Sequence, residues 1–145
     1  MIEKIESQGK LLGLIVRAEF RKPGIHFFTP NEFSQQVALM SHPKGKCIEP
    51  HIHNHVVREV TYTQEVLLIR KGSLRVDFYS EDKNYLESRV LTDGDLILLA
   101  SGGHGFEILE DVEMFEIKQG PYTGDSDKAR FQGVPRDQLK GTGGL

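Results

Sequence analysis

The sequence lacks most of the features that mark secreted, membrane-spanning or nucleic-acid-binding proteins. It contains a single cysteine, Cys47, so an internal disulfide is excluded and a reducing cytoplasm suits the chain. No apolar run approaches the ~20 residues that a membrane-spanning helix needs, and the charged start MIEKIESQGK has no secretory h-region. The basic residues form no long run, and the net charge is -3. We therefore expect a soluble cytoplasmic protein that binds neither nucleic acid nor membranes.

The chain also has few helix signals, and strand signals dominate it. At 145 residues it is long enough for one domain with a single core. Short segments rich in branched or aromatic residues alternate with turn residues, and they span 35–43, 63–72, 73–80, 87–92, 95–101, 105–110 and 112–120. Alternation is clearest where Leu74, Val76 and Phe78 share one strand face. The pattern predicts an all-β fold, either a β-sandwich or a small barrel.

Three local patterns complete the expected organisation. Asp93-Gly94 lies between apolar runs and predicts a β-hairpin. The stretch TPNEFSQQ predicts one short helical turn, with a threonine or an asparagine as its cap. Beyond the last strand signal the alternation is lost, while glycine and charge increase. We therefore expect a barrel over 1–123 and a loosely ordered tail over 124–145, draped over a partner.

Three of the six histidines lie close together, at His51, His53 and His55. On an extended strand these side chains project to the same side, and Glu65 opens the next apolar run. A hairpin-like connection would bring Glu65 beside His51 and His53. Imidazoles and a carboxylate are ligands that Zn, Fe, Mn or Ni bind in proteins. The pattern predicts a metal site, and the alternative is a solvated turn that is rich in histidine.

The spacing around these residues resembles the first motif of the cupin superfamily. Gly45 is followed by five residues and then by His51 and His53. Glu65 is followed by six residues and then by Gly72. In cupins the histidines and the glutamate of this motif bind a divalent metal inside a jelly-roll barrel.

A later stretch is similar to the second cupin motif, which begins at a glycine and ends at a histidine ligand. Here GDLILLASGGH runs from Gly94 to His104. The resemblance covers roughly 37–118, and it implies a single-domain double-stranded β-helix, the cupin jelly roll. It also implies one divalent transition metal, which is Zn, Fe, Mn or Ni. The ligands that it implies are His51, His53, Glu65 and His104.

Two departures from the cupin pattern leave alternatives open. Eleven residues separate His53 from Glu65, where cupins have only a few. The alternatives to Glu65 as a ligand are Glu59, Gln64 and His55. Glu65 is preferred because it alone keeps the six-residue step to the glycine. In the second motif Ala100 replaces the usual proline, and His104 comes one residue early.

The stretch from Gly94 to Tyr122 is similar to small cupins related to sugar-modifying proteins, including the WxcM-like group. This resemblance implies a metal-binding cupin that acts on or binds a small polar, carbohydrate-type ligand. The expected enzyme is a keto-sugar isomerase or epimerase of surface-polysaccharide biosynthesis, in which the metal polarises the carbonyl. The candidates for moving the proton are Glu107, Tyr62 and His55. An Fe(II)-dependent dioxygenase and a non-catalytic binding module are the alternatives.

Strand edges predict how the chain assembles. A small jelly roll leaves edges that proteins often cover by pairing, and two-chain assemblies are common among cupins. The N-terminal stretch KLLGLIVRAEF is able to supply a strand to a neighbour. We predict a homodimer with a small-molecule ligand.

Overall fold

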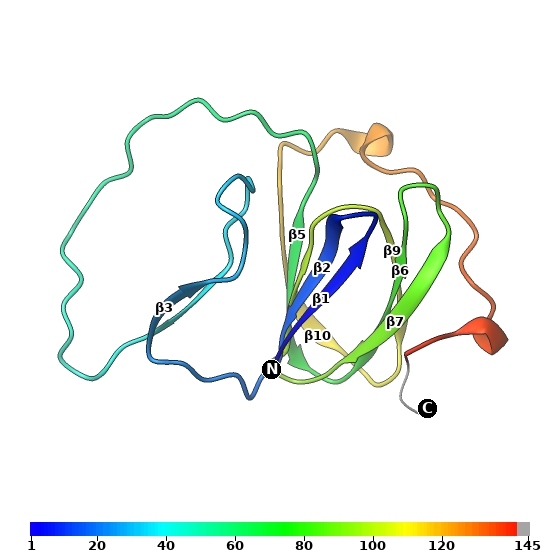
Figure 1. Cartoon of the computed structure of the whole chain (residues 1–145), viewed down its shortest axis with the longest axis horizontal. Helices are drawn as coiled ribbons and strands as arrows, with labels where there is room; N and C mark the ends of the chain where they lie inside the picture. Colours follow the sequence, from blue (N-terminus) through cyan, green and yellow to red (C-terminus); the bar gives the residue numbers. More distant parts are fainter. Residues whose placement is uncertain (142–145) are drawn as a thin grey trace. The chain divides into compact units, whose positions relative to one another are not determined.

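The chain is an all-β protein whose antiparallel strands form three sheets, which confirms the predicted class (Figure 1). The computed structural model describes residues 1–141. The strands of this part are β1 (Ile2–Ser7), β2 (Lys10–Val16), β3 (Gly24–Phe27), β4 (Ala38–Ser41), β5 (Glu65–Lys71), β6 (Leu74–Tyr79), β7 (Tyr85–Leu91), β8 (Leu96–Leu99), β9 (Gly103–Ile108) and β10 (Glu113–Lys118). Two short 3-10 helices follow, η1 (Gly124–Asp127) and η2 (Arg136–Gln138). No helix of the described chain is long and apolar enough to cross a membrane.

The chain separates into two compact units. The first contains Met1–Phe20 together with the chain from Tyr62 onward, and the second is Arg21–Thr61. The first unit holds a five-stranded sheet in the order β1-β2-β8-β5-β10 and a three-stranded sheet in the order β7-β6-β9. The second unit holds the pair β3-β4. The N-terminal stretch proposed as a strand for a neighbour forms β2, which lies between β1 and β8 of the chain's own sheet.

The core of the first unit lies between its two sheets. The shared face predicted for Leu74, Val76 and Phe78 of β6 is confirmed, because all three belong to the core cluster, although the residues between them are buried as well. From β5, Leu67 and Ile69 enter the same cluster. The other members are Ile5, Leu12, Ile15, Leu91, Ile97 and Leu99. Burying one such side chain contributes about 1.5–3 kcal/mol, so this cluster holds the two sheets together.

From β5 onward the chain passes back and forth between the two sheets. β5, β8 and β10 belong to the five-stranded sheet, whereas β6, β7 and β9 belong to the three-stranded sheet. The hairpin predicted at Asp93-Gly94 is therefore wrong, because the turn joins β7 and β8, which lie in different sheets. Two hydrogen bonds fix the position of the Asp93-Gly94 turn, one to β5 and one to the turn at Gly72. Gly94 N donates to Ile69 O over 2.7 Å, and Gly72 N donates to Asp93 Oδ1 over 2.6 Å.

The second unit contains little regular structure, and the predicted helical turn is absent from it. The side-chain amide of Gln36 donates instead to the carbonyl oxygens of Pro30, Asn31 and Phe33, over 2.9, 3.3 and 2.9 Å. Hydrogen bonds from a side chain to the backbone compete with helix formation. They explain why this stretch forms a closed turn.

The strand expected around the three clustered histidines does not form. No strand is assigned between Ser41 and Glu65 in the described chain. β4 pairs only with β3, so residues 51–55 have none of the ladder hydrogen bonds that keep a strand extended. Loops of this length without secondary structure are uncommon in compact domains, and many of them are functional.

The C-terminal segment packs against the three-stranded sheet of its own unit. The ring of Phe131 meets the ring of Tyr79 edge-on, with centroids 5.0 Å apart. Three residues farther along the chain, Val134 N donates to Tyr79 Oη over 3.0 Å. The sequence predicts a loosely ordered tail draped over a partner, whereas these residues bind the chain's own sheet. Residues 142–145 of the predicted tail lie outside the described residues.

Candidate functional site

A pocket of about 480 Å³ opens in the first unit where β5 and β9 begin. The C-terminal segment after η1 forms one of its walls. The lining residues are Thr63, Glu65, Tyr79, Gly102, Gly103, His104, Gly105, Asp127, Lys128, Ala129, Arg130, Phe131 and Gly133. Pockets of this size are typical of sites for small molecules.

Two of the four predicted metal ligands meet inside this pocket, and they come from opposite sheets. Glu65 begins β5, and its parity with the buried Leu67 turns its side chain inward. His104 is in register with the buried Phe78, so its side chain also turns inward from β9. The two side chains meet, with His104 Nε2 lying 3.2 Å from Glu65 Oε2.

The contact with His104 sets the charge of Glu65. This hydrogen bond lowers the pKa of Glu65 below its usual value, although partial burial acts in the opposite direction. The positive charges of Lys118 and Lys128 lower the pKa further. Glu65 is therefore a carboxylate at neutral pH. A carboxylate bonded to an imidazole can exchange protons with a ligand, and the same pair offers two ligands to a divalent metal.

The wall formed by the C-terminal segment is fixed at two points. At one point Asp127 Oδ2 lies 3.4 Å from Lys118 Nζ, and Thr123 Oγ1 donates to Asp127 Oδ1 over 3.3 Å. At the other point a Cβ added to Gly103 would lie 2.9 Å from Phe131 Cζ, so glycine lets the ring approach β9. Lys128, Ala129 and Arg130 lie between these two points.

Sequence reasoning missed the residues of this wall. The segment shows no strand alternation, and its glycines and charges are typical of a mobile tail. The sequence contains one signal that this segment packs against the fold. Phe131 is a large apolar residue in a polar context, directly after Lys128-Ala-Arg130. A ring at such a position needs apolar surface to cover it, and here Tyr79 provides that surface.

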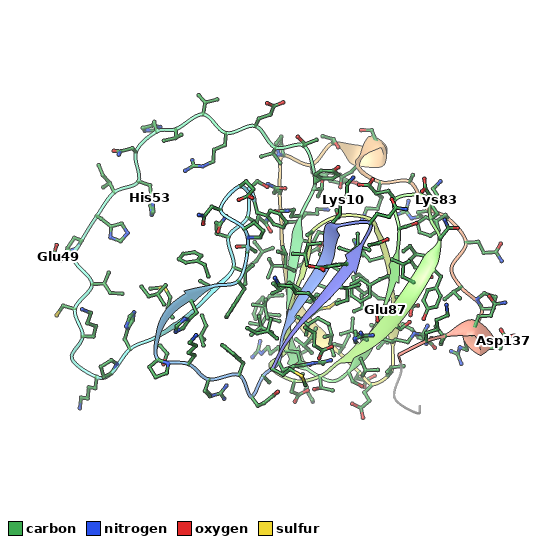
Figure 2. The ribbon with its side chains drawn as sticks, in the orientation of Figure 1. Lys10, Glu49, His53, Lys83, Glu87 and Asp137 are labelled. Carbon is green, nitrogen blue, oxygen red and sulfur yellow. The ribbon has the colours of Figure 1, made fainter. Side chains whose placement is uncertain are left out.

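The other two predicted metal ligands, His51 and His53, belong to the second unit. Both side chains are exposed, and their ring centroids are 5.3 Å apart. Figure 2 labels His53 on the stretch without regular secondary structure. Among the side chains that the structure describes, no group of three or more histidines, cysteines, aspartates or glutamates is placed to hold a metal ion. The four-ligand metal site stays a prediction.

The alternatives to Glu65 as a metal ligand lie outside the pocket lining. Glu59 and His55 are exposed side chains of the second unit. Gln64 is buried directly before Glu65, and its backbone N donates to Gln119 Oε1 over 3.0 Å. Of the residues considered for this position, Glu65 is the one whose side chain reaches His104.

The candidates for proton transfer also lie outside the lining. Tyr62 Oη donates to Glu81 Oε1 over 3.4 Å. Glu107 is one position out of phase with Phe106 and His104, so it turns to the opposite face of β9. The third candidate, His55, is in the second unit. The pocket therefore offers Glu65 and His104 as its own acid-base groups.

A second polar cluster occupies the outer face of the three-stranded sheet. Arg75 Nε lies 2.7 Å from Asp77 Oδ1, and Arg75 Nη1 lies 2.6 Å from Glu107 Oε2. Ser88 Oγ donates to Asp77 Oδ1 over 2.5 Å, and Arg136 binds the other carboxylate oxygen of Glu107. The hydrogen bond with Asp77 raises the pKa of Arg75 above its usual value. Each charged group of this cluster already has a partner of opposite charge.

Comparison with known proteins adds no family to this geometry. No protein-family model matches the chain, and no curated protein or solved structure matches it. The fold and the pocket define a class, which is an all-β protein with a carboxylate-imidazole pair between two antiparallel sheets.

Proposed function

We propose that the protein binds a small polar, carbohydrate-type ligand in the pocket beside Glu65 and His104. One observation carries the proposal. Two polar side chains from opposite sheets meet at 3.2 Å inside a pocket of about 480 Å³. A well-formed pocket with a few convergent polar groups is the usual form of a small-molecule site.

A cupin-type jelly roll is the fold that we propose around this site. A jelly roll has eight strands in two sheets, connected by Greek keys. The six strands β5 to β10 divide equally between two sheets and pass repeatedly from one to the other, which supports the proposal. Two more strands would complete the barrel along the edges of β9 and β10 that pair with no described strand, and the strand beside β10 would come from a second copy of the chain. The exposed apolar side chains of these two strands are the surface that such strands would cover: Phe106, Ile108, Met114, Phe115 and Ile117.

The chemistry of the pocket suits a sugar. Sugar hydroxyls donate and accept hydrogen bonds, and Glu65 offers carboxylate oxygens while His104 offers a ring nitrogen. The rings of Tyr79 and Phe131 line the same pocket and offer apolar surface to the C–H groups of a sugar ring. Polar anchors combined with aromatic surface favour a small polyol over a purely apolar ligand.

As an enzyme, the protein would isomerise or epimerise a keto sugar. Such a reaction moves a proton to and from the carbon beside a carbonyl group. Glu65 and His104 are the acid-base pair that lines the pocket, so we assign the proton transfer to them. In the alternative, Glu65 and His104 would hold a metal, which would supply a Lewis acid to the carbonyl oxygen. These two assignments exclude one another, because a residue that coordinates a metal is not free to carry the proton, and the metal content of the protein distinguishes them.

Sugar binding tests the proposal. Ligand-observed NMR with a set of ketoses and aldoses should detect binding to the wild type, and the variants Glu65→Gln and His104→Gln should each lose it. Glu113→Gln is the matched control, because Glu113 contacts the exposed Arg70 at 3.8 Å on the surface. Sugar binding that survives both pocket substitutions would overturn the proposal. Binding without turnover of any keto sugar would identify a binding module.

Metal content tests the predicted ligand set. Elemental analysis of the purified wild type should find close to one equivalent of a divalent transition metal. His51→Ala, His53→Ala, Glu65→Gln and His104→Ala should each lose it. His42→Ala, which removes another exposed histidine of the second unit, should keep it. A wild type that binds no metal on titration would contradict the prediction, and oxygen uptake with Fe(II) would point to the dioxygenase.

The homodimer also stays a prediction, and the outer edge of β10 is where we expect pairing. β10 pairs only with β5 among the described strands, and Phe115 and Ile117 on it are exposed. An open edge with apolar side chains favours pairing with another chain. Sedimentation velocity should find a dimer that Ile117→Lys weakens. A monomer at all concentrations would contradict the prediction.

A further inference from the structure

We propose that the ligand carries an oxyanion, a phosphate or a carboxylate, and that Lys128 and Arg130 bind it in the pocket. This inference rests on the proposed function, because it adds a second point of contact to the same ligand. The sugar part of the ligand contacts Glu65 and His104, and its charged part contacts the C-terminal wall.

The two basic side chains form no direct ion pair among the described residues, although the charge of Lys128 lowers the pKa of Glu65. Lys128 and Arg130 both line the pocket, and neither forms an ion pair within the described chain. The neighbouring acid does not neutralise them, because Asp127 already binds Lys118 at 3.4 Å. Their charges are therefore available to a ligand.

The two acids of the pocket lining already have contacts of their own. The lining contains two acids, Glu65 and Asp127, and two bases, Lys128 and Arg130. Asp127 binds Lys118, and Glu65 contacts His104. An anionic ligand would give Lys128 and Arg130 a direct partner of opposite charge, whereas a neutral ligand would not.

The anchors on both sides hold the basic residues in place before a ligand arrives. On one side Asp127 is bound by Lys118 and Thr123, and on the other side Phe131 packs on Tyr79. A short segment between two fixed points loses less conformational freedom on binding than a free tail does, and this raises affinity. Arg and Lys are the residues that bind phosphate and carboxylate groups most strongly.

Calorimetric titration with four probes tests the inference. The probes are glucose, glucose 6-phosphate, glucuronate and inorganic phosphate. The wild type should bind glucose 6-phosphate or glucuronate more tightly than glucose, and the tighter of the two identifies the anion. Lys128→Gln and Arg130→Gln should each weaken binding of that probe about fivefold, and they should leave glucose binding unchanged. Lys4→Gln, an exposed lysine of β1 in the same unit, should have no effect.

The outcomes separate this inference from the proposed function. Equal affinity of the wild type for charged and neutral probes, unchanged in Lys128→Gln and Arg130→Gln, would overturn the oxyanion site. The proposed function would stand if Glu65→Gln still abolished glucose binding. Phosphate binding that depends on Lys128 and Arg130, with no sugar binding at Glu65 and His104, would support the oxyanion site and overturn the proposed function. Affinity for the charged probe should also fall as salt rises.

Discussion

The first unit has two polar clusters, and they differ in whether their charged groups have partners within the chain or line an open pocket. In the outer cluster, Arg75 is bound by Asp77 and Glu107, and it is almost fully buried. In the pocket, Lys128 and Arg130 line an open space and form no ion pair with a described residue. Groups whose partners are all within the chain hold the fold together, whereas groups that face an open pocket are available to a ligand.

This difference also corrects the role suggested for Glu107. From the sequence, Glu107 is a candidate for moving the proton because it lies on a late strand that can reach the cavity. In the structure both of its carboxylate oxygens bind arginines, Arg75 and Arg136. A carboxylate held in this way stabilises the packing of the C-terminal segment, so we assign Glu107 a structural role.

The largest expected effect comes from breaking the closed cluster. Asp77→Asn removes one partner of the buried Arg75, and loss of one member of a buried ion pair costs about 3–5 kcal/mol. We expect about 3 kcal/mol, the lower end of that range, because Glu107 still faces Arg75. Urea unfolding measures the change in the free energy of unfolding.

Two controls make this prediction specific. Glu113→Gln removes the same charge from an exposed ion pair, with 66% and 65% of the two side chains accessible, and should cost less than about 0.5 kcal/mol. Lys128→Gln should leave stability unchanged within about the same margin. If Asp77→Asn proved as mild as these two variants, the outer cluster would not hold the fold as described.

A smaller effect, dependent on pH, is expected at Glu3. Burial alone would raise its pKa, but hydrogen bonds from Arg17 at 2.6 Å and Arg89 at 3.0 Å outweigh burial and lower the pKa. A lowered pKa stabilises the folded state above the unfolded value near 4.5 and loses this contribution as pH falls through the folded value. Glu3→Gln should therefore cost about 1.5 kcal/mol at pH 7.

The sign of the pH dependence is the decisive part of that prediction. The gap in stability between wild type and Glu3→Gln should close as pH falls below about 4.5. Urea unfolding at pH 7, 5 and 3.5 measures the gap. A gap that stays constant over this range would mean that the charge of Glu3 contributes nothing to stability.

The smallest expected effect is at Tyr79, whose ring and hydroxyl oxygen contact the C-terminal segment. Tyr79→Phe keeps the ring that packs on Phe131 but removes the oxygen that accepts from Val134 N. Loss of one such hydrogen bond costs about 1 kcal/mol. We expect faster tryptic cleavage after Lys128 and Arg130, measured by mass spectrometry, with little change in global stability. Unchanged cleavage would contradict the anchor that we describe.

Much of the core between the two sheets can be predicted from the alternation of residues along the strands. Leu74, Val76 and Phe78 are buried as the pattern predicts, because one face of β6 packs on the opposite sheet. Alternation also predicts that Glu65 turns inward with Leu67 and Ile69. The meeting of Glu65 with His104 is implied only by the cupin resemblance, because the sequence gives no secure parity for His104.

The rest depends on contacts that no local pattern reveals. Arg75 and Asp77 occupy the face that alternation makes solvent-exposed, yet both are buried because other strands and the C-terminal segment supply partners. Asp93-Gly94 has the composition of a hairpin turn, but the strands beside it pair in different sheets. A turn sequence sets local geometry, whereas the choice of sheet depends on long-range pairing.

Whether the pocket beside Glu65 and His104 is the ligand site is best tested by NMR. Backbone amide shifts of ¹⁵N-labelled protein should be followed during titration with glucose 6-phosphate. We expect the largest changes in Gly102–Gly105 and in residues 128–131, with small changes around Arg75 and Asp77. Largest changes outside the pocket, or no changes at millimolar ligand, would mean that the pocket is not the ligand site.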